Sequence, residues 1–125
     1  MASQTQPVYE FTAYYRATSM GGRDEAWVFR LEGGELVRVE PAITERSRSG
    51  SHGYDTYRLG PGRYVVIEVS RPNNRAKPYT VTVKELQISP SLQAMWRGLF
   101  IEEVEDLDMD MVLERVREVV AHGPA

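Results

Sequence analysis

Arginine and aromatic residues are the side chains of this 125-residue chain whose types and spacing could do chemistry. Thirteen of the 15 basic residues are arginine, and 7 tyrosines and 2 tryptophans accompany them. Guanidinium groups make forked contacts with phosphates and stack on planar rings. The candidate cations and rings occupy predicted strands and the loops beside them: Tyr14, Arg16, Trp27, Arg30, Arg38, Arg46, Arg48, Tyr54, Tyr57, Arg58, Arg71, Arg75 and Lys77. Such a set suits an extended anionic ligand with planar groups, because each stacked base contributes roughly 1–3 kcal/mol.

The distribution of charge supports a basic surface on an acidic protein. The formal net charge is −3, yet residues 41–84 carry eight basic and three acidic side chains. Residues 88–125 carry three basic and eight acidic side chains. Local potential matters more than the overall pI for an anionic partner. An alternative stays open, in which tyrosines fill the core, arginines solvate its edge, and the arginine content reflects a GC-rich genome or a thermophilic source.

Sites of covalent or metal chemistry have little support. The chain contains no cysteine, which excludes disulfides, thiolate zinc sites and thiol nucleophiles. The two histidines, His52 and His122, lie 70 positions apart. A Ser–His–Asp set can be drawn around His52 and Asp55, but no nucleophile elbow supports it. There is no phosphate-binding glycine loop. We expect neither an enzyme nor a bound cofactor or metal.

Three alternating acids, Asp106, Asp108 and Asp110, are similar to the start of a calcium-binding loop. Met111 stands at the sixth position, where glycine is needed, and Arg117 at the twelfth, where glutamate is needed. Acids are favoured at the start of a helix by the helix dipole. The three acids therefore indicate a helix N-terminus and not a calcium site.

Period-two alternation and aromatic or β-branched residues predict strands over 7–17, 26–31, 36–40, 54–59, 64–69 and 79–88. Between them, residues 42–53 form an arginine- and serine-rich segment that predicts a long loop, and 71–78 predict a second loop with three cations. The hydrophobic pattern favours a three-residue loop at 33–35, which pairs Leu31 with Val37. In that register Arg30 lies opposite Arg38 on an outer face, where an anion or a carboxylate would have to offset the repulsion.

The spacing of apolar residues becomes helical after residue 89. One stripe runs over 92–104 and a second over 109–120, each with period 3–4. We therefore predict an α+β protein, with an antiparallel sheet of about five to six strands followed by two C-terminal helices packed on one face. The chain forms a single domain, 1–125, with a sheet region at 7–88 and a helical region at 89–123. The second stripe also fits a short homodimer seam through residues 109–120.

The layout resembles that of the ThermoDBP-related proteins, an archaeal group of single-stranded DNA-binding proteins that do not use the OB fold. The likeness lies in the basic, aromatic-bearing sheet region at 9–88 and in the helical segments that end with 109–116. It implies a cleft between sheet and helices in which apolar side chains hold bases and basic groups flank them. It also implies dimerisation through C-terminal helices, of which this sequence offers only a short seam.

The sequence thus favours a cytoplasmic protein that binds single-stranded nucleic acid without sequence preference, DNA before RNA by resemblance alone. Neither an apolar run long enough to span a bilayer nor a signal peptide is visible, and the composition is that of a folded protein. Both predicted helices are acidic, which argues against reading of duplex DNA by a basic helix. The alternative is a protein-interaction module that docks through the acidic C-terminal helices.

Overall fold

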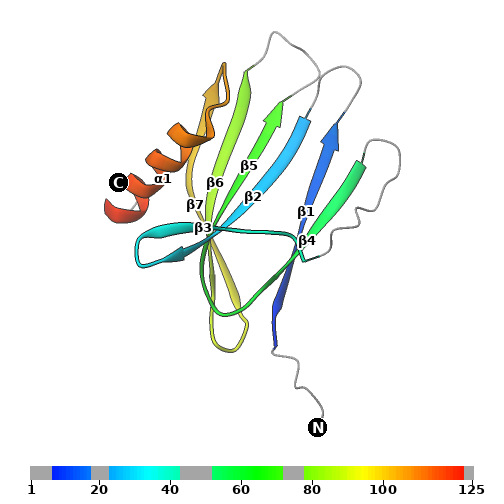
Figure 1. Cartoon of the computed structure of the whole chain (residues 1–125), viewed down its shortest axis with the longest axis vertical. Coiled ribbons are helices and arrows are strands. Elements are labelled where there is room, and N and C mark those ends of the chain that lie inside the picture. The colour runs from blue at the N-terminus through cyan, green and yellow to red at the C-terminus, as the bar shows by residue number, and fades with distance from the viewer. Residues whose placement is uncertain (1–6, 18–22, 43–51, 72–77, 123–125) are drawn as a thin grey trace.

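The computed structural model describes residues 7–17, 23–42, 52–71 and 78–122. Within these ranges the chain forms seven strands and one helix (Figure 1). Their bounds are β1 Tyr9–Ala17, β2 Arg23–Glu32, β3 Glu35–Val39, β4 His52–Leu59, β5 Gly62–Arg71, β6 Tyr79–Ile88, β7 Ala94–Val104 and α1 Met109–His122. The predicted α+β class and antiparallel sheet are confirmed, whereas the prediction of two C-terminal helices is wrong.

All seven strands belong to one antiparallel sheet. Six of them follow the order β4-β1-β2-β5-β6-β7, and the seventh, β3, pairs with β2. Strand β2 carries two neighbours on one edge: its first residues pair with β1, and its last five residues pair with β3. Strand β5 pairs along the other edge of β2, from residue 23 to residue 30. Because β1 and β3 share this edge of β2, the sheet divides there, with the β1–β4 pair on one branch and β3 on the other (Figure 1).

Each face of the sheet buries its own hydrophobic cluster. On the face we call the helix face, α1 lies across the central strands, and Val112 and Val116 pack on a buried cluster from β2, β5 and β6: Phe29, Val65, Ile67, Val69, Val81 and Val83. On the opposite face, the inner face, the cluster includes residues of five strands: Ala13, Val28, Tyr57, Leu59, Tyr64, Val66, Leu86 and Ile88. Branched and aromatic side chains favour strands because they pack well on a pleated surface.

The inner face is curled. Phe11 of β1 contacts Trp96 of β7, with ring centroids 5.3 Å apart, although three strands separate β1 from β7 in the sheet. The β1–β4 pair therefore folds across the inner face toward β7. This places an aromatic contact between two segments 85 residues apart in the sequence.

The segment predicted as the first helix, 92–104, is strand β7. The error has a physical cause, a β-bulge where Lys84 pairs with Gly98 while Val83 pairs with Phe100. The extra residue, Leu99, reverses the alternation of faces along β7. Trp96 lies on the inner face, whereas the extra residue Leu99 and its neighbour Phe100 both pack against the helix-face cluster. The bulge thus adds an apolar residue at i+3 from Trp96, which together with i+4 resembles a helix stripe.

The predicted hairpin register is also wrong. The loop has two residues, Gly33 and Gly34, and Leu31 pairs with Leu36. Both glycines have positive φ, 56° and 86°, which is the backbone that a two-residue loop joining twisted strands requires. Arg30 pairs with Val37, and the expected pairing of Arg30 with Arg38 does not occur. Turn geometry here outweighed the hydrophobic pattern.

The second predicted helix is confirmed as α1. Asp108 acts as its N-cap: its Oδ1 accepts hydrogen bonds from the backbone N–H groups of Asp110, at 3.1 Å, and Met111, at 3.4 Å. Val112 and Val116 are 6% and 0% exposed against the sheet of their own chain. The apolar stripe proposed as a homodimer seam through residues 109–120 is thus used within the subunit. In the part of the chain that the structure describes, no helix is long and apolar enough to cross a membrane.

Candidate functional site

The predicted arginines do not gather on one face of the sheet. Arg30 pairs with Tyr64, which belongs to the inner-face cluster, whereas Arg38 pairs with Phe29 of the helix face. Each of the two arginines forms an ion pair with a carboxylate two residues along the chain: Arg30 with Glu32 at 2.8 Å, and Arg38 with Glu40 at 3.8 Å. A further ion pair joins Arg58 to Glu10 at 3.9 Å. The common positive patch expected around Arg30 and Arg38 is absent from the described residues.

The predicted stacking residues are partly used in the core. Tyr57 is 2% exposed and Trp27 packs against the helix-face cluster, so both rings serve packing. Tyr54 is 49% exposed. Arg71 donates a 3.3 Å hydrogen bond to the hydroxyl of Tyr79 and stacks over its ring. The other predicted site groups lie outside the described residues: Arg46, Arg48, Arg75, Lys77 and the side chains of Tyr14 and Arg16.

A different cluster, which we call the arginine clamp, consists of Arg63 of β5, Glu85 of β6 and Arg97 of β7. Glu85 is the buried charged residue of the described core, at 4% exposure. Its Oε2 accepts from Arg63 Nε at 2.7 Å and from Arg63 Nη2 at 2.6 Å, and its Oε1 accepts from Arg97 Nη2. Both guanidinium groups remain about half exposed, at 45% and 54%. The clamp therefore holds two accessible cations in fixed positions around one buried carboxylate.

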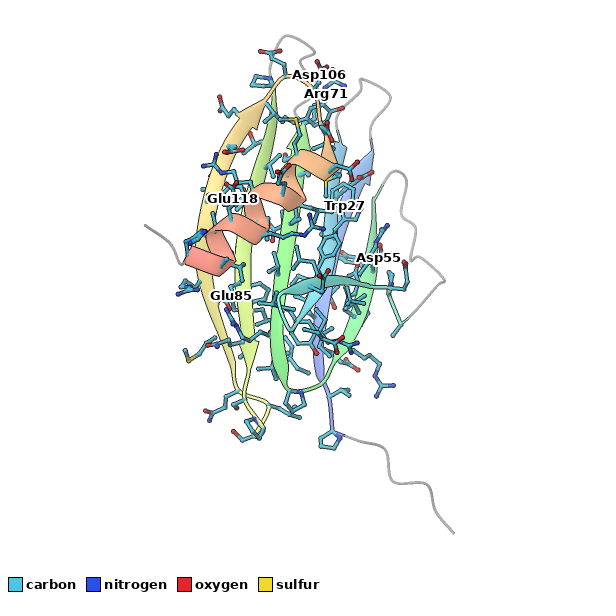
Figure 2. The ribbon with its side chains drawn as sticks, turned by 60° about the vertical axis from the view of Figure 1, so that its left-hand side comes forward. Trp27, Asp55, Arg71, Glu85, Asp106 and Glu118 are labelled. Atoms are coloured by element: carbon cyan, nitrogen blue, oxygen red, sulfur yellow. The ribbon has the colours of Figure 1, made fainter. Side chains whose placement is uncertain are left out.

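The register of the sheet explains how these three residues meet. Glu85 pairs with Val65 on one side and Arg97 on the other, and Arg63 is two residues before Val65. All three side chains are on the helix face, where Glu85 lies beyond the C-terminal end of α1 (Figure 2). Because α1 does not extend to this end of the sheet, the two cations remain accessible to solvent.

A surface cavity of about 280 Å³ adjoins the clamp. It is lined by the clamp residues together with Gln87, Met95 and Trp96. Met95 is 66% exposed and Trp96 41% exposed, which is unusual for large apolar residues on a strand. The cavity thus brings together two cations and an amide on the helix face, and Trp96, whose ring lies on the inner face, borders it along the β7 edge.

The ring of Trp96 lies on the inner face. The ammonium nitrogen of Lys84 lies 5.9 Å from the centroid of its ring. Lys84 forms an ion pair with Glu68 at 3.1 Å, and both side chains are about two-fifths exposed. The cation, the indole and the ring of Phe11 therefore lie side by side beneath the curled sheet.

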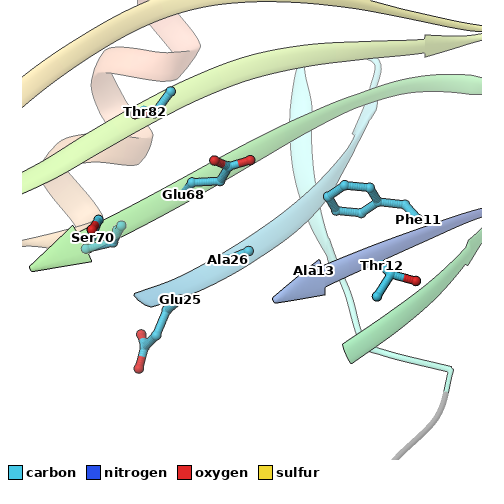
Figure 3. Close-up of a pocket in the computed structure, with 9 residues that line it drawn as sticks. Phe11, Thr12, Ala13, Glu25, Ala26, Glu68, Ser70 and Thr82 are labelled. Carbon is cyan, nitrogen blue, oxygen red and sulfur yellow. The ribbon is translucent and has the colours of Figure 1, made fainter. Parts of the chain in front are cut away.

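A second cavity, of about 370 Å³, lies on the inner face between β1, β2, β5 and β6 (Figure 3). Figure 3 shows the ring of Phe11 reaching across it toward Glu68. Its other lining residues are Thr12, Ala13, Glu25, Ala26, Val69, Ser70 and Thr82. The described residues contain no group of three or more His, Cys, Asp or Glu side chains placed to hold a metal ion. The lining combines apolar side chains with two hydroxyls, Thr12 and Ser70, and two carboxylates, Glu25 and Glu68.

One titratable group in the inner cluster has a perturbed pKa. Burial raises the pKa of the Tyr64 hydroxyl above its ordinary value of 10.0. The positive charge of Arg30 acts in the opposite direction and the negative charge of Glu32 in the same direction. The hydroxyl donates a 2.8 Å hydrogen bond to the carbonyl of Gly60. Tyr64 is therefore a packing residue, protonated at neutral pH.

Comparison with known proteins identifies the fold and no family. No family model matches the chain, and no curated protein matches it. Among solved structures, ORF157 from Acidianus filamentous virus 1 has a TM-score of 0.66 at 16% identity, over 90% of this chain and 76% of the viral chain. A glutamate-to-alanine variant of ORF157 gives a TM-score of 0.63 at 18% identity, over 88% and 74% of the two chains.

An engineered protein solved by the Northeast Structural Genomics Consortium gives a TM-score of 0.63 at 15% identity. The match spans 80% of this chain and 60% of the engineered protein, which is less than two-thirds of that protein's length. At these identities the likeness is one of fold. The function therefore has to be argued from the side chains of this chain.

Sequence reasoning missed the arginine clamp and Trp96, although one signal was present. The strand at 79–88 alternates apolar residues at 79, 81 and 83, and Glu85 continues the buried series. A carboxylate at an inward position needs a cationic partner, because burying an unpaired charge is costly. What the sequence could not supply was the identity of the partners, since Arg63 and Arg97 come from two different strands.

Proposed function

We propose that the protein is a non-catalytic, sequence-tolerant binder of single-stranded nucleic acid, DNA before RNA, and that its interface is the arginine clamp with Trp96. The observation that carries the proposal is the cavity lined by Arg63 and Arg97 and bordered by Trp96, a residue 41% exposed whose ring lies across the β7 edge from the two arginines. Phosphate oxygens would bind the guanidinium groups on one side of the β7 edge, and a base would stack on the indole on the other side. The interface lies at β7 and not across the strands proposed from the sequence.

The charge of the clamp favours an anion. Two guanidinium groups against one carboxylate leave a net charge of +1, on a chain whose formal net charge is −3. Two guanidinium groups carry ten N–H donors, more than the lone pairs of one carboxylate can accept. Glu85 orients the two cations, and their remaining hydrogen-bonding capacity suits a phosphate.

The indole supplies the sequence tolerance. Every base has a planar face, so stacking on Trp96 discriminates little between bases and contributes roughly 1–3 kcal/mol. Lys84, 5.9 Å from the ring centroid, adds positive potential on the inner side of the indole. Sequence-specific reading of a duplex, in contrast, requires a helix or strand pair inserted into the major groove, and stacking on an indole does not use such an element.

Fluorescence anisotropy with labelled dT, rU and duplex oligonucleotides tests the proposal at several salt concentrations. With two phosphate contacts, log K should fall with log salt at a slope of about −1.4, from 0.7 per contact. Replacing Arg63→Ala should weaken dT binding roughly tenfold, in line with a lost charge-assisted hydrogen bond. The matched control is Arg38→Ala, which removes an arginine of similar exposure, 54%, that does not line the cavity.

The measurements have clear contrary outcomes. Equal loss of affinity in the Arg63 and Arg38 variants would place the interface elsewhere, and salt-independent binding would contradict phosphate contacts. Titration with dT should also quench the fluorescence emission of Trp96, whereas titration with duplex should leave the emission unchanged. An absence of any oligonucleotide binding at low salt would reject the function as a whole.

The opposite end of α1 favours a second candidate, a module that docks a basic protein segment. Met111 is 68% exposed and lines a cavity of about 300 Å³ between α1 and β7. Acidic residues surround it in the lining: Glu102, Asp106, Asp108, Glu114 and Glu118. An apolar anchor within an acidic rim suits a basic peptide with one apolar side chain. Replacing Met111→Asp should abolish such docking and leave oligonucleotide affinity unchanged.

A further inference from the structure

Strand β7 presents an open edge. Within the described residues it pairs with β6 and has no second neighbour in the sheet. Proteins usually protect an edge strand of this length with charges, proline or a cover, because its free N–H and C=O groups invite another strand. Strand β7 carries three charged residues, Arg97, Glu102 and Glu103, but two of its apolar side chains are also strongly exposed, Met95 at 66% and Ile101 at 70%.

The β-bulge at Leu99 gives this edge an internal symmetry. Before the bulge, Arg97 lies on the helix face and Gly98 on the inner face, as shown by their pairing with Glu85 and Lys84. After it, Ile101 lies on the inner face and Glu102 on the helix face, opposite Thr82 and Val81. In either direction outward from the Leu99–Phe100 pair, the next residue is therefore on the inner face and the one after it on the helix face.

Two copies of such a strand can pair antiparallel about a two-fold axis at the Leu99–Phe100 bond. Each Gly98 then lies opposite the Ile101 of the other copy, and each Arg97 opposite the other Glu102. Residues directly opposite must share a face of the sheet, and both of these pairings satisfy that requirement. A strand without the bulge would place residues of opposite faces together in this register.

The paired residues are complementary in charge and in shape. Arg97 holds Glu85 and Glu102 holds Arg115 within each chain, so the register places these two ion pairs side by side on each side of the axis, with opposite charges across the strands. A side-chain Cβ added at Gly98 would meet no atom within 4 Å, and Gly98 lines an apolar cavity of about 480 Å³. The exposed Ile101 of a second copy would enter this space above the glycine. A slip of two residues along the strand places Arg97 opposite Phe100 or Val104 and loses the charge pairing.

We propose that β7 is the interface of a homodimer, in which a second copy of this chain continues the sheet antiparallel with Gly98 opposite Ile101. The occupant is argued from charge complementarity, from the space at Gly98 and from the match of faces on both sides of the bulge. The interface differs from the seam through residues 109–120 suggested by the sequence. It shares Arg97 and the β7 edge with the proposed nucleic-acid interface, but its tests require no nucleic acid.

Cysteine cross-linking tests the register, because the chain has no cysteine of its own. The double variant Gly98→Cys/Ile101→Cys should form a disulfide-linked dimer under mild oxidation. Within one chain the two positions are about 10 Å apart along the strand, too far for a disulfide. The control Gly98→Cys/Glu103→Cys shifts one thiol by two residues on the same face and should remain monomeric on a non-reducing gel.

Light scattering measures the assembly itself. The full chain at about 50 μM, without nucleic acid, should have twice the 14.2 kDa mass of one chain. Replacing Ile101→Lys should reduce the mass to that of the monomer, with unchanged helix content by circular dichroism, because Ile101 is 70% exposed. A wild-type mass of 14.2 kDa, or equal cross-linking of both cysteine pairs, would overturn the proposal. Since these assays contain no oligonucleotide, their outcome is separate from that of the binding assay.

Discussion

Replacing Glu85→Gln is the sharpest test of how the arginine clamp is held. The change keeps the size of the side chain but removes its charge and one acceptor oxygen. Glu85 is 4% exposed and accepts three contacts from two arginines. An amide can still accept through its oxygen from one arginine, while its NH₂ group would face the N–H donors of the other.

The expected cost follows from these contacts. Hydrogen bonds to charged groups contribute about 1.5–3 kcal/mol each, and the lower end applies because the half-exposed arginines regain water. With one arginine lost and the other weakened, we expect the free energy of unfolding to fall by about 2 kcal/mol. For a domain of this length that corresponds to a decrease in Tm of roughly 8 °C.

Urea unfolding followed by tryptophan fluorescence and circular dichroism measures the change. Glu68→Gln is the matched control, because Glu68 is a carboxylate 42% exposed with one ion pair, to Lys84. Such a pair contributes at most about 1 kcal/mol. If both variants lose the same small amount, Glu85 does not organise the clamp and the reasoning is refuted. Tighter dT binding by the Glu85 variant at low salt would in addition support the clamp as the phosphate site, since the local net charge rises by one.

The other predictions concern single residues of the fold. Because burial raises the pKa of Tyr64, the unfolded chain loses the tyrosine proton first, so stability should fall as pH rises above 10.0; Tyr64→Phe should flatten this alkaline decline in a pH series of urea midpoints. Gly34→Ala should cost about 1 kcal/mol, because Gly34 has φ of 86° in the β2–β3 turn, whereas Gly60→Ala, at a site with open space and no positive φ, should be nearly neutral. Val116→Ala should cost about 2 kcal/mol by leaving a space under α1, and Met111→Ala, on the exposed side of the same helix, less than about 0.5 kcal/mol.

Each of these has a result that would contradict it. An equal alkaline decline with and without the Tyr64 hydroxyl would mean that another group causes it. Equal stability of the two glycine variants would remove the argument that the turn conformation sets the hairpin register. A Val116 variant as stable as wild type would show that α1 contributes little by packing on the sheet.

The sequence predicted most strands because their signal is local. Period two and β-branched residues locate the strand at 79–88 to the residue, and the capping aspartates locate α1. Strand β7 was mistaken for a helix because a bulge is a property of pairing with β6, which the sequence does not display. The hairpin register failed for a related reason: the φ values of Gly33 and Gly34 decided it, and not the apolar pattern.

The candidate site was harder to predict than the fold. Composition indicated arginine and aromatic residues, and the proposed interface is of that kind, but it uses Arg63, Arg97 and Trp96 in place of Arg30, Arg38 and Trp27. Which arginine meets a carboxylate depends on strand order and curl. Those depend on contacts between residues far apart in the chain, such as that of Phe11 with Trp96.

The split edge of β2 has a consequence for how the molecule opens. Among the described residues, β1 meets β2 through two residue pairs, Arg16 with Asp24 and Ala17 with Arg23, whereas it meets β4 through eight. The β1–β4 ribbon is therefore held to β2, β5 and β6 mainly by the packing of Ala13, Tyr57 and Leu59 in the inner-face cluster, and we expect it to open as a unit before the central strands separate. Amide hydrogens of the ribbon should exchange with solvent sooner than those of β5, and each such opening uncovers Trp96 from its neighbour Phe11.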